Sequence, residues 1–463
     1  MPDLDLAVIG SGPGGYVAAI HAARMGAKVA IVEEKDWGGT CLNAGCIPTK
    51  SLIQSVEVLK TVRDAAEFGV KVGPAQADWP AMQRRKDTIV SGMRQGVRGL
   101  LKAHGVEMIS GRGRLARGTV VAVDGRELDA RSVLLAPGSV PSRPPFAGAD
   151  LGLSSDDILT VPQVPRSLVV IGGGVVGMEF AAIFNRLGTR VIVVELLDQL
   201  LSPLDTDIAT RFQQLMTRRG VEFHLKARVE KIERGGSAYR VTFNEQTVET
   251  DLVLVATGRR PNTEDMGLEE AGVARERGAI KVDRHLRTSV HGVYAIGDAT
   301  MVSMLAHTAT YQGEVAVINA IGEKRVSADY RAIPACVYTD PEIAYVGLSE
   351  NQARAAGEDV EIGTFPFSAL GRAMLLGETA GLVKVVTGTD GCILGVSMLG
   401  PRASDLIAEA ALALNQGITA AELAHTVHAH PTLPEALAEA ALDVAGRAIH
   451  VAPKRSSPPR RGM

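Results

Sequence analysis

The chain has 463 residues, of which 46% are hydrophobic and 22% charged, and its formal net charge is −3 at pH 7. This composition is typical of a globular enzyme and excludes a largely disordered chain, and the charge gives no general attraction for nucleic acid. No apolar run is long enough to cross a bilayer, and the start, MPDLDLAVIG, lacks the features of a secretory signal. We therefore expect a cytoplasmic protein that binds neither nucleic acid nor membranes.

The first predicted elements belong to a pattern that occurs twice. Residues 6–33 and residues 168–195 each predict a strand, a glycine turn, an amphipathic helix and a second strand, which is the dinucleotide-binding βαβ unit. Both copies end on an acid, Glu33 in the first and Glu195 in the second. The matched glycines are Gly10, Gly12 and Gly15 in the first copy and Gly172, Gly174 and Gly177 in the second.

Each part of this pattern has a chemical reason. Glycine lets the backbone turn sharply and approach a pyrophosphate closely, and the start of the helix supplies the positive end of a dipole. The acid can accept hydrogen bonds from the two ribose hydroxyls. One such glycine pattern is weak evidence, but two matched copies predict two dinucleotide sites in one chain.

Directly after the first copy, residues 38–50 read GGTCLNAGCIPTK and hold Cys41 and Cys46, two of only four cysteines. In a reducing compartment such a pair is more often a metal site or a redox dithiol than a structural bridge. Zinc needs about four ligands, and no second cysteine pair or histidine stands nearby, so redox chemistry is favoured. Five residues would place the cysteines on different helix faces, so we expect an interruption at Asn43 and Gly45 if the sulfurs bond.

Later segments complete the two halves. Residues 131–138 and 251–258 (RSVLLAPG and DLVLVATG) predict a returning strand in each half, and the proline-rich residues 139–145 suggest a boundary. Residues 288–298 predict an apolar strand ending at Asp298, whose carboxylate could meet a sugar or ribityl hydroxyl. From about Ile343 the pattern changes to a short antiparallel sheet followed by alanine-rich helices, which indicates a separate C-terminal domain.

Together these features resemble the flavin-dependent pyridine-nucleotide disulfide oxidoreductases over nearly the whole chain. Residues 38–50 match the redox-disulfide motif of that family, and residues 288–298 are similar to its second flavin motif. Within the family, the strongest similarity is to the members that oxidise dihydrolipoamide. It rests on residues 304–313 (MLAHTATYQG), 338–350 (YTDPEIAYVGLSE), 393–410 (ILGVSMLGPRASDLIAEA) and 428–442 (HAHPTLPEALAEAAL).

The resemblance implies an α/β fold with two Rossmann-like dinucleotide-binding domains and a C-terminal α+β dimerisation domain. The expected domains are 1–145 (first part of the FAD-binding domain), 146–272 (NAD-binding), 273–342 (second part of the FAD-binding domain) and 343–450 (dimerisation). Residues 451–463, with the basic stretch KRSSPPRR, are expected to form a solvated, disordered tail.

The cofactors follow from the same resemblance, with FAD in the first copy and NAD in the second. Residue chemistry agrees on NAD, because Glu195 would repel the 2′-phosphate of NADP and the following LLDQL offers no arginine. The implied FAD contacts are Gly10, Gly12, Gly15, Glu33, Gly39, Thr40, Lys50, Gly113, Gly138, Asp298, Met304, Leu305, Ala306 and His307. The implied NAD contacts are Gly172, Gly174, Val176, Gly177, Glu179, Glu195, Val229 and Gly258.

The resemblance also implies the roles around the cysteines. Cys41 is the exposed thiol that exchanges with substrate, and Cys46 faces the flavin and forms a charge-transfer thiolate. Lys50 is expected beside the flavin and paired with Glu179. A lysine on a helix surface is the alternative interpretation of Lys50, and the sequence does not decide between them.

Dithiol oxidation needs a base, because a thiol with a pKa of about 8.5 is mostly protonated at neutral pH. His425, His428 and His430 cluster in AHTVHAHP, but no cysteine or well-placed acid completes a metal site, so we expect no metal. The family pattern HPTLPE selects His430 as the acid/base and Glu435 as the carboxylate that orients its ring. His425 and His428 are interpreted as packing residues.

The resemblance implies a homodimer in which His430 serves Cys41 of the partner subunit. The expected further partners are lipoyl domains of the acyltransferase subunits of 2-oxoacid dehydrogenase complexes, or the carrier protein of glycine cleavage. Some residues depart from the usual pattern: Trp37 replaces a common aliphatic residue, Pro137 a threonine, and HTATYQG lacks a lysine and an acid often found there.

Two other functions are compatible with parts of this sequence. One is an NADPH-dependent glutathione-type or mercuric reductase. Glu195 argues against it, and so does the lack of a terminal cysteine pair, because Cys336 and Cys392 stand alone and are interpreted as buried small hydrophobes. The other is a flavin-bearing scaffold subunit whose redox role is secondary.

Overall fold

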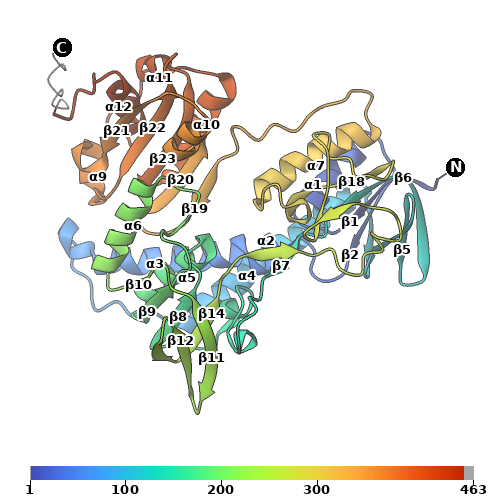
Figure 1. The fold of residues 1–463 in the computed structure, drawn as a ribbon, viewed down its shortest axis with the longest axis horizontal. Helices are drawn as coiled ribbons and strands as arrows, with labels where there is room; N and C mark the ends of the chain where they lie inside the picture. Colours follow the sequence, from blue (N-terminus) through green and yellow to red (C-terminus); the bar gives the residue numbers. More distant parts are fainter. Residues whose placement is uncertain (1, 453–463) are drawn as a thin grey trace. The chain divides into compact units, whose positions relative to one another are not determined.

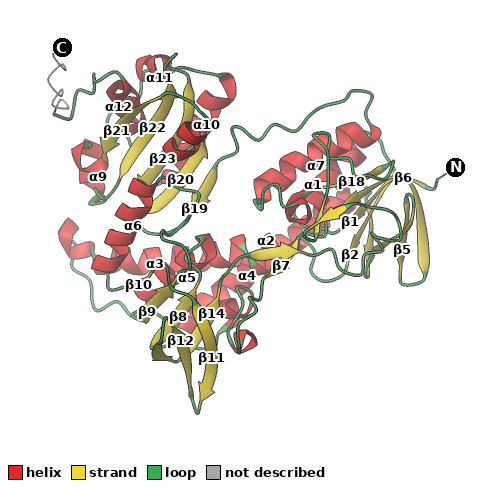
Figure 2. Cartoon of the chain, in the orientation of Figure 1, coloured by secondary structure: helices red, strands yellow, loops and turns green. Residues whose placement is uncertain are grey.

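The computed structural model describes residues 2–452, and the chain divides into two compact units (Figure 1). Among the described residues, unit 1 contains 2–172, 186–189 and 229–328, and unit 2 contains 173–185, 190–228 and 329–452. Both units combine helices and strands (Figure 2). The predicted disordered tail lies outside the described residues, apart from Val451 and Ala452.

The main sheet of unit 1 has the strand order β3-β2-β1-β6-β5-β4, with β18 paired to β6. Strands β1, β2, β3, β6 and β18 pair in parallel, whereas β4 and β5 form antiparallel pairs at one edge. The strands are β1 (Leu4–Ile9), β2 (Val29–Glu33), β3 (Glu107–Ser110), β4 (Arg114–Arg117), β5 (Val120–Val123), β6 (Arg126–Leu135) and β18 (Val293–Ala295).

Both faces of this sheet are buried. In β1, Leu6 and Val8 belong to one core cluster, and Ala7 and Ile9 belong to another, as alternation along a strand requires. The first cluster is shared with α1 (Pro13–Arg24) and α7 (Ala306–Ile321), which pack together over the sheet (Figure 1). The first glycine turn, between β1 and α1, therefore sits at the carboxyl end of a parallel strand, where open α/β sheets bind ligands.

Unit 1 also holds the helices that carry the cysteines, and several smaller sheets. The helices are α2 (Gly39–Ala44), α3 (Cys46–Arg63) and α4 (Trp79–Ala103), with single turns η1 (Ala65–Phe68), η2 (Ala149–Leu151), η3 (Asp157–Thr160) and η4 (Gly297–Thr300). Antiparallel pairs or sheets are β7 (Ser139–Pro141) with β15 (Arg259–Pro261), β16 (Arg275–Glu276) with β17 (Ala279–Ile280), and β11 (Val229–Gly235) with β12 (Ala238–Phe243) and β13 (Gln246–Thr250). Strand β8 (Ser167–Ile171) pairs in parallel with β14 (Leu252–Val255).

In unit 2 the second βαβ unit continues along the chain after β8. It comprises α5 (Val175–Arg186, whose last residue belongs to unit 1), β9 (Arg190–Val194), α6 (Thr206–Arg218) and β10 (Glu222–His224), and β9 pairs in parallel with β10. The sequence thus predicts both Rossmann-like halves correctly.

The C-terminal part of unit 2 is an antiparallel sheet in the order β19-β20-β23-β22-β21, with α12 packed on β21 and β22 and α10 on β20 and β23. Its strands are β19 (Ala335–Val337), β20 (Glu342–Gly347), β21 (Val360–Pro366), β22 (Leu382–Gly388) and β23 (Ile393–Gly400). Its helices are α8 (Glu350–Ala355), α9 (Gly371–Leu376), α10 (Ala403–Gln416), α11 (Ala420–His425) and α12 (Glu435–Val444), with the turn η5 (Phe367–Ala369). This arrangement confirms the predicted change to an antiparallel sheet with helices.

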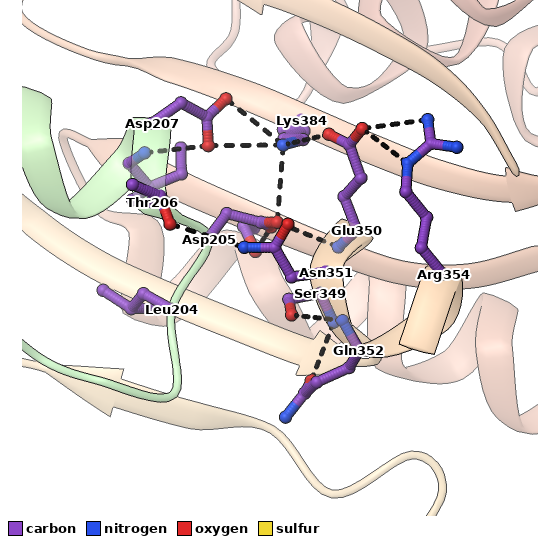
Figure 3. A network of polar contacts seen from close by, with 12 residues as sticks. Leu204, Asp205, Thr206, Asp207, Ser349, Glu350, Asn351, Gln352, Arg354 and Lys384 are labelled. Atoms are coloured by element: carbon purple, nitrogen blue, oxygen red, sulfur yellow. Dashed lines mark hydrogen bonds and ion pairs between the residues drawn. The ribbon is translucent and has the colours of Figure 1, made fainter. Parts of the chain in front are cut away.

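A buried ion cluster joins three segments within unit 2 (Figure 3). The Nζ atom of Lys384, on β22, lies 3.4 Å from Oδ1 of Asp205, 3.2 Å from Oδ2 of Asp207 and 2.9 Å from Oε2 of Glu350. Asp205 also accepts the backbone N–H of Glu350 at 2.8 Å and the hydroxyl of Ser397 at 3.3 Å. The cluster holds the start of α6 and the start of α8 against the antiparallel sheet.

Candidate active site and nucleotide sites

The first glycine turn is shaped for close approach of a ligand. Gly10 has a φ of +98°, and a Cβ there would collide with the carbonyl oxygen of Ala136, the residue that follows β6. A Cβ on Gly15 would collide with the carbonyl oxygen of Gly10. At Gly12, however, a Cβ would meet no protein atom within 4 Å, and no side chain caps the start of α1. The open space at a helix N-terminus suits a pyrophosphate.

The second turn repeats this geometry. Gly172 has a φ of +110°, and its Cβ would collide with the carbonyl oxygen of Ala256, which follows β14 as Ala136 follows β6. At Gly174 an added Cβ again meets nothing within 4 Å. In both turns the first glycine is packed against backbone, whereas the second glycine has free space beside it. This geometry fits one dinucleotide pyrophosphate at each turn.

The two acids are held in the same way as well. Glu33 accepts the backbone N–H groups of Ser11 and Lys35, both at 2.9 Å. Glu195 accepts the corresponding N–H groups, from Gly173 and, at 2.8 Å, from Leu197. Glu33 also accepts the hydroxyl of Ser11, at 2.6 Å. A carboxylate offers about four lone-pair positions, so three bonds on Glu33 and two on Glu195 still leave capacity for ribose hydroxyls.

The other FAD candidates belong to unit 1. Gly39 and Thr40 begin α2, and a Cβ on Gly39 would lie 2.5 Å from the Cα atom of Gly12, so α2 approaches the glycine turn closely. The rest lie at element ends: Gly113 between β3 and β4, Gly138 before β7, Asp298 in η4, and Met304, Leu305, Ala306 and His307 at the start of α7. These residues fit a bound flavin dinucleotide, and their contacts with it stay a prediction.

The two cysteines form a disulfide, with Cα atoms 4.7 Å apart. Cys41 lies in α2 and Cys46 is the first residue of α3, and both are half-buried. Gly45 separates the helices with φ −142° and ψ −112°, far from helical values. The predicted interruption between the cysteines is confirmed.

Asn43 does more than permit this turn. Its Nδ2 atom donates to the carbonyl oxygens of Trp37 at 3.1 Å and Gly39 at 2.9 Å, and its Oδ1 atom accepts from Nε of Arg94 at 2.9 Å. The side chain therefore anchors the cysteine turn to α4. A lone asparagine between two cysteines gave no sequence signal for this anchor, because Arg94 is 51 residues away.

Lys50 and Glu179 fall in different units, so their predicted pairing remains a prediction. Lys50 stands four residues after Cys46 on α3, which puts both on one face of that helix. Glu179, on α5, is 3% exposed, and its Oε1 atom accepts the backbone N–H of Tyr338 at 3.0 Å. This hydrogen bond fixes the position of the buried carboxylate.

His430 and Glu435 form the predicted pair. The Nδ1 atom of His430 lies 2.9 Å from Oε1 of Glu435, and the imidazole is 79% exposed. The other oxygen of Glu435 accepts the backbone N–H of Thr432 at 2.7 Å. Burial would raise the pKa of the Glu435 carboxyl, but the hydrogen bonds from Thr432 and His430 outweigh it, so this pKa lies below its ordinary value. The carboxylate is fixed and ionised, and it can orient the ring with Nε2 outward.

The structure differs from the predictions for some of the residues that were interpreted as packing residues. His425 is exposed rather than packed, because it stands at the end of α11, where its ring nitrogen Nδ1 lies 2.6 Å from the Ala421 carbonyl oxygen of its own helix. The side chain of His428 is 8% exposed, as expected of a packing residue, but it pairs with Glu409 at 2.8 Å. Cys336 and Cys392 are half-buried rather than buried, since Cys336 packs at the edge of the C-terminal core and Cys392 follows the turn at Asp390.

The remaining NAD candidates lie in both units. Val176 and Gly177 belong to α5, Val229 starts β11, and Gly258 follows β14 with a φ of +105° and open space around an added Cβ. Their common contact with one nucleotide stays a prediction. Between residues 2 and 452, no group of three or more His, Cys, Asp and Glu side chains is arranged to hold a metal ion, and no helix is long and apolar enough to cross a membrane.

Comparisons with known proteins agree with this geometry. The family model described as pyridine nucleotide-disulphide oxidoreductase matches residues 4–313, and that of the family's dimerisation domain matches residues 333–441. Two proteins named dihydrolipoyl dehydrogenase are similar over nearly their whole length. The one from Chlamydia muridarum is 43% identical, covering 97% of this chain and 99% of the relative, and one from Bacillus subtilis is 40% identical, covering 96% and 100%.

Solved structures show the same fold. LpdA from Mycobacterium tuberculosis superimposes with a TM-score of 0.88 at 31% identity, covering 94% of this chain and 99% of that one. The HOCl-induced flavoprotein disulfide reductase RclA from Escherichia coli gives a TM-score of 0.86 at 28% identity, covering 94% and 99%. The matched dimerisation domain supports a homodimer, and the family match implies a flavin and a pyridine nucleotide. The chain belongs to the pyridine nucleotide-disulphide oxidoreductase family.

Proposed function

We propose that this protein is a dihydrolipoyl dehydrogenase that oxidises dihydrolipoamide through the Cys41–Cys46 disulfide, with FAD at the first glycine turn and NAD at the second. The observation that carries the proposal is the disulfide itself, closed between α2 and α3 directly after the first nucleotide-binding unit. The names of relatives at 40–43% identity support the choice of substrate.

The first step is thiol–disulfide exchange. One substrate thiol loses its proton and attacks the sulfur of Cys41, the Cys41–Cys46 bond breaks, and Cys46 leaves as a thiolate. The second substrate thiol then attacks the substrate sulfur of the mixed disulfide, and the released Cys41 sulfur takes up the proton of that thiol. The substrate leaves as a cyclic disulfide, and the enzyme holds the two electrons on its cysteine pair.

His430 is proposed to accept the proton of the first substrate thiol. Its Nδ1 atom is held by Glu435, so Nε2 is the nitrogen that faces outward to the substrate. Orientation by a carboxylate fixes the ring tautomer and stabilises the imidazolium that forms. In the proposed homodimer His430 serves Cys41 of the partner subunit.

When bound, the flavin supplies the two-electron chemistry that links the dithiol to the nicotinamide. The chain's own residues bind and orient: Gly12 and the start of α1 face the pyrophosphate, Glu33 the ribose, and Asp298 the ribityl chain. Cys46 is proposed to face the flavin, with Lys50 beside it. Glu179 holds Lys50 if the predicted pair forms.

The nicotinamide cofactor is proposed to be NAD rather than NADP. Glu195 is ionisable and already fixed by the N–H groups of Gly173 and Leu197, so it cannot swing away from a 2′-phosphate without losing both hydrogen bonds. A phosphate beside it would meet a like charge. Comparing kcat/KM with NAD and NADP tests this choice, and a preference for NADP would favour the glutathione-type reductases.

The proposal also includes the domain division predicted from the sequence, a cytoplasmic location, and lipoyl domains as partners. The partners are the lipoyl domains of 2-oxoacid dehydrogenase complexes or the glycine cleavage carrier protein. NAD reduction by the full-length protein with the reduced, dihydrolipoyl form of each domain tests them, and the unlipoylated domain is the control, because it carries no thiols to oxidise.

The deciding experiment is steady-state NAD reduction with free dihydrolipoamide in the parent protein and in Cys41→Ser. The variant should lose the activity while keeping bound flavin, because the exchange has no sulfur to attack. Cys392→Ser, which changes a half-buried cysteine outside the proposed site, is the matched control and should keep the parent rate. Equal rates in the parent and Cys41→Ser would refute the proposed electron path.

A further inference from the structure

Asp298, the proposed ribityl ligand, is not an isolated carboxylate. It lies in η4, directly after β18, and its Oδ2 atom is 2.5 Å from the hydroxyl of Ser139. Ser139 is 159 residues earlier in the chain and only 4% exposed. A buried hydroxyl at this distance restricts the carboxylate to one orientation, with Oδ2 occupied and Oδ1 left for another donor.

Ser139 is itself held by Arg259. The Nε atom of Arg259 donates to Oγ of Ser139 at 2.7 Å, and a terminal nitrogen donates to the backbone oxygen of the same residue at 2.8 Å. The other terminal nitrogen lies 3.4 Å from the hydroxyl of Ser155 and 3.7 Å from Asp156. The Arg259 side chain is 17% exposed, and each nitrogen of its guanidinium has a partner within unit 1.

The direction of the hydrogen bonds follows from their chemistry. A guanidinium has only donors, so Oγ of Ser139 must accept from Arg259. The single hydroxyl proton of Ser139 is then available to Asp298, whose carboxylate can only accept. The three residues form a one-way relay from Arg259 through Ser139 to Asp298, and the relay is charged at both ends, which strengthens each bond.

The backbone supports the same arrangement. Ser139 starts β7 and Arg259 starts β15, and these two strands pair antiparallel with Arg259 opposite Pro141 and Ser139 opposite Pro261. Each strand follows the returning strand of one nucleotide-binding half, β6 or β14. The relay therefore connects the proposed flavin carboxylate to the segment where the chain passes between the two halves.

We propose that Ser139 and Arg259 are positioning residues for FAD binding that act through Asp298. This inference rests on the proposed function, in which Asp298 accepts a hydroxyl of the ribityl chain. The relay presents Oδ1 of Asp298 to the cofactor before it binds, so FAD does not have to order the carboxylate on arrival.

The test measures FAD binding to the flavin-free full-length chain by the quenching of flavin fluorescence, in Ser139→Ala, Arg259→Met and Asp298→Ala. Arg259→Met should weaken FAD binding in the same direction as Ser139→Ala. Loss of one charge-assisted hydrogen bond should raise the FAD dissociation constant about ten-fold in Ser139→Ala. The double variant Ser139→Ala, Asp298→Ala should bind FAD with the same dissociation constant as Asp298→Ala, because Ser139 acts only through the Asp298 carboxylate. Ser142→Ala and Arg260→Met are matched controls, because Ser142 bonds through its backbone and Arg260 pairs with Glu264 on the surface.

The outcomes are separable. If Asp298→Ala weakens FAD binding and Ser139→Ala does not, the relay is refuted and the proposed function stands. If Asp298→Ala and the isosteric Asp298→Asn both bind FAD with the affinity of the parent, the proposed contact between Asp298 and the ribityl chain is refuted. The proposed role of Ser139 and Arg259 is then refuted too. If Ser139→Ala lowers the unfolding midpoint of the flavin-free chain and leaves its FAD affinity unchanged, the contact is only structural and the inference is overturned.

Discussion

The Nδ1 atom of His430 lies 2.9 Å from Oε1 of Glu435, whose second oxygen is held by the backbone N–H of Thr432. If this pair is the base of the reaction, His430→Gln should lower kcat/KM for dihydrolipoamide by about a hundred-fold or more. Glu435→Gln should cost less, because the imidazole remains and loses only its orientation. Steady-state NAD reduction measures both.

His425→Gln is the control for this pair, since His425 is an exposed histidine whose ring bonds to the Ala421 carbonyl oxygen of its own helix. It should keep the parent kcat/KM. The assignment would be contradicted if His425→Gln and His430→Gln had equal effects. It would also be contradicted if Glu435→Gln impaired NADH oxidation by an artificial one-electron acceptor, which needs no thiol base, as strongly as it impaired dihydrolipoamide oxidation.

The second prediction uses the open glycine of each turn. An added methyl at Gly12 or Gly174 meets no protein atom within 4 Å, so the fold should tolerate alanine at both positions. Gly174→Ala should raise the KM for NAD about ten-fold by crowding the pyrophosphate and its hydrogen bonds, without loss of bound flavin. Gly12→Ala should instead weaken FAD binding.

Gly172→Ala is the contrasting variant, because we expect it to destabilise the fold. Its φ is +110° and its Cβ would collide with the carbonyl oxygen of Ala256. The unfolding midpoint should therefore drop for Gly172→Ala and not for Gly174→Ala. If Gly174→Ala left the KM for NAD unchanged, the second turn would not be the NAD site.

The features that the sequence predicts correctly are those fixed over short distances. The two glycine turns, the break at Gly45 and the pairing of His430 with Glu435 each depend on residues within one motif. The acids Glu33 and Glu195 could be predicted too, because a βαβ unit sets their distance from the turn. These contacts join residues that lie close together in the chain, so the spacing of residues within a motif is enough to predict them.

The features that the sequence does not predict join segments far apart in the chain. Ser139 meets Arg259 and Asp298 across 120 and 159 residues, and Asn43 meets Arg94 across 51. Lys384 stands in the strand GLVKVV, where a lysine between valines suggests a solvent-facing position, yet it is buried. Its burial depends on carboxylates from distant segments, so no local pattern reveals it.

The third prediction concerns the stability that this buried lysine provides. Lys384→Met removes the cation that pairs with Asp205, and the Asp205 side chain is 2% exposed. An uncompensated buried carboxylate should lower the free energy of unfolding by about 3–5 kcal/mol. Arg354→Met removes only an exposed partner of Glu350 on α8 and should cost about 0.5 kcal/mol or less. Denaturant unfolding followed by circular dichroism compares the two, and equal losses would contradict the role of Lys384.

The pH dependence of that loss is the fourth prediction. The hydrogen bond from Lys384 lowers the pKa of Glu350 more than burial raises it, with Arg354 adding to the lowering. A carboxyl with a lowered pKa in the folded state stabilises the fold above its unfolded pKa of about 4.3, and this contribution is lost as the pH falls through the folded value. Burial would lower the pKa of Lys384, but Glu350, Asp205 and Asp207 outweigh it and raise that pKa, so the lysine contributes fully below about pH 10.4.

The difference in unfolding free energy between the parent and Lys384→Met should therefore be constant from about pH 5.5 to pH 9. It should narrow below about pH 4, because protonation of the carboxylates removes the attraction in the parent and the repulsion in the variant. Unfolding curves at pH 7.0, 5.5 and 3.5 for the parent, Lys384→Met and Arg354→Met measure this trend. A difference that stays the same at pH 3.5 would mean that Lys384 stabilises unit 2 through packing of its methylene chain rather than through its charge.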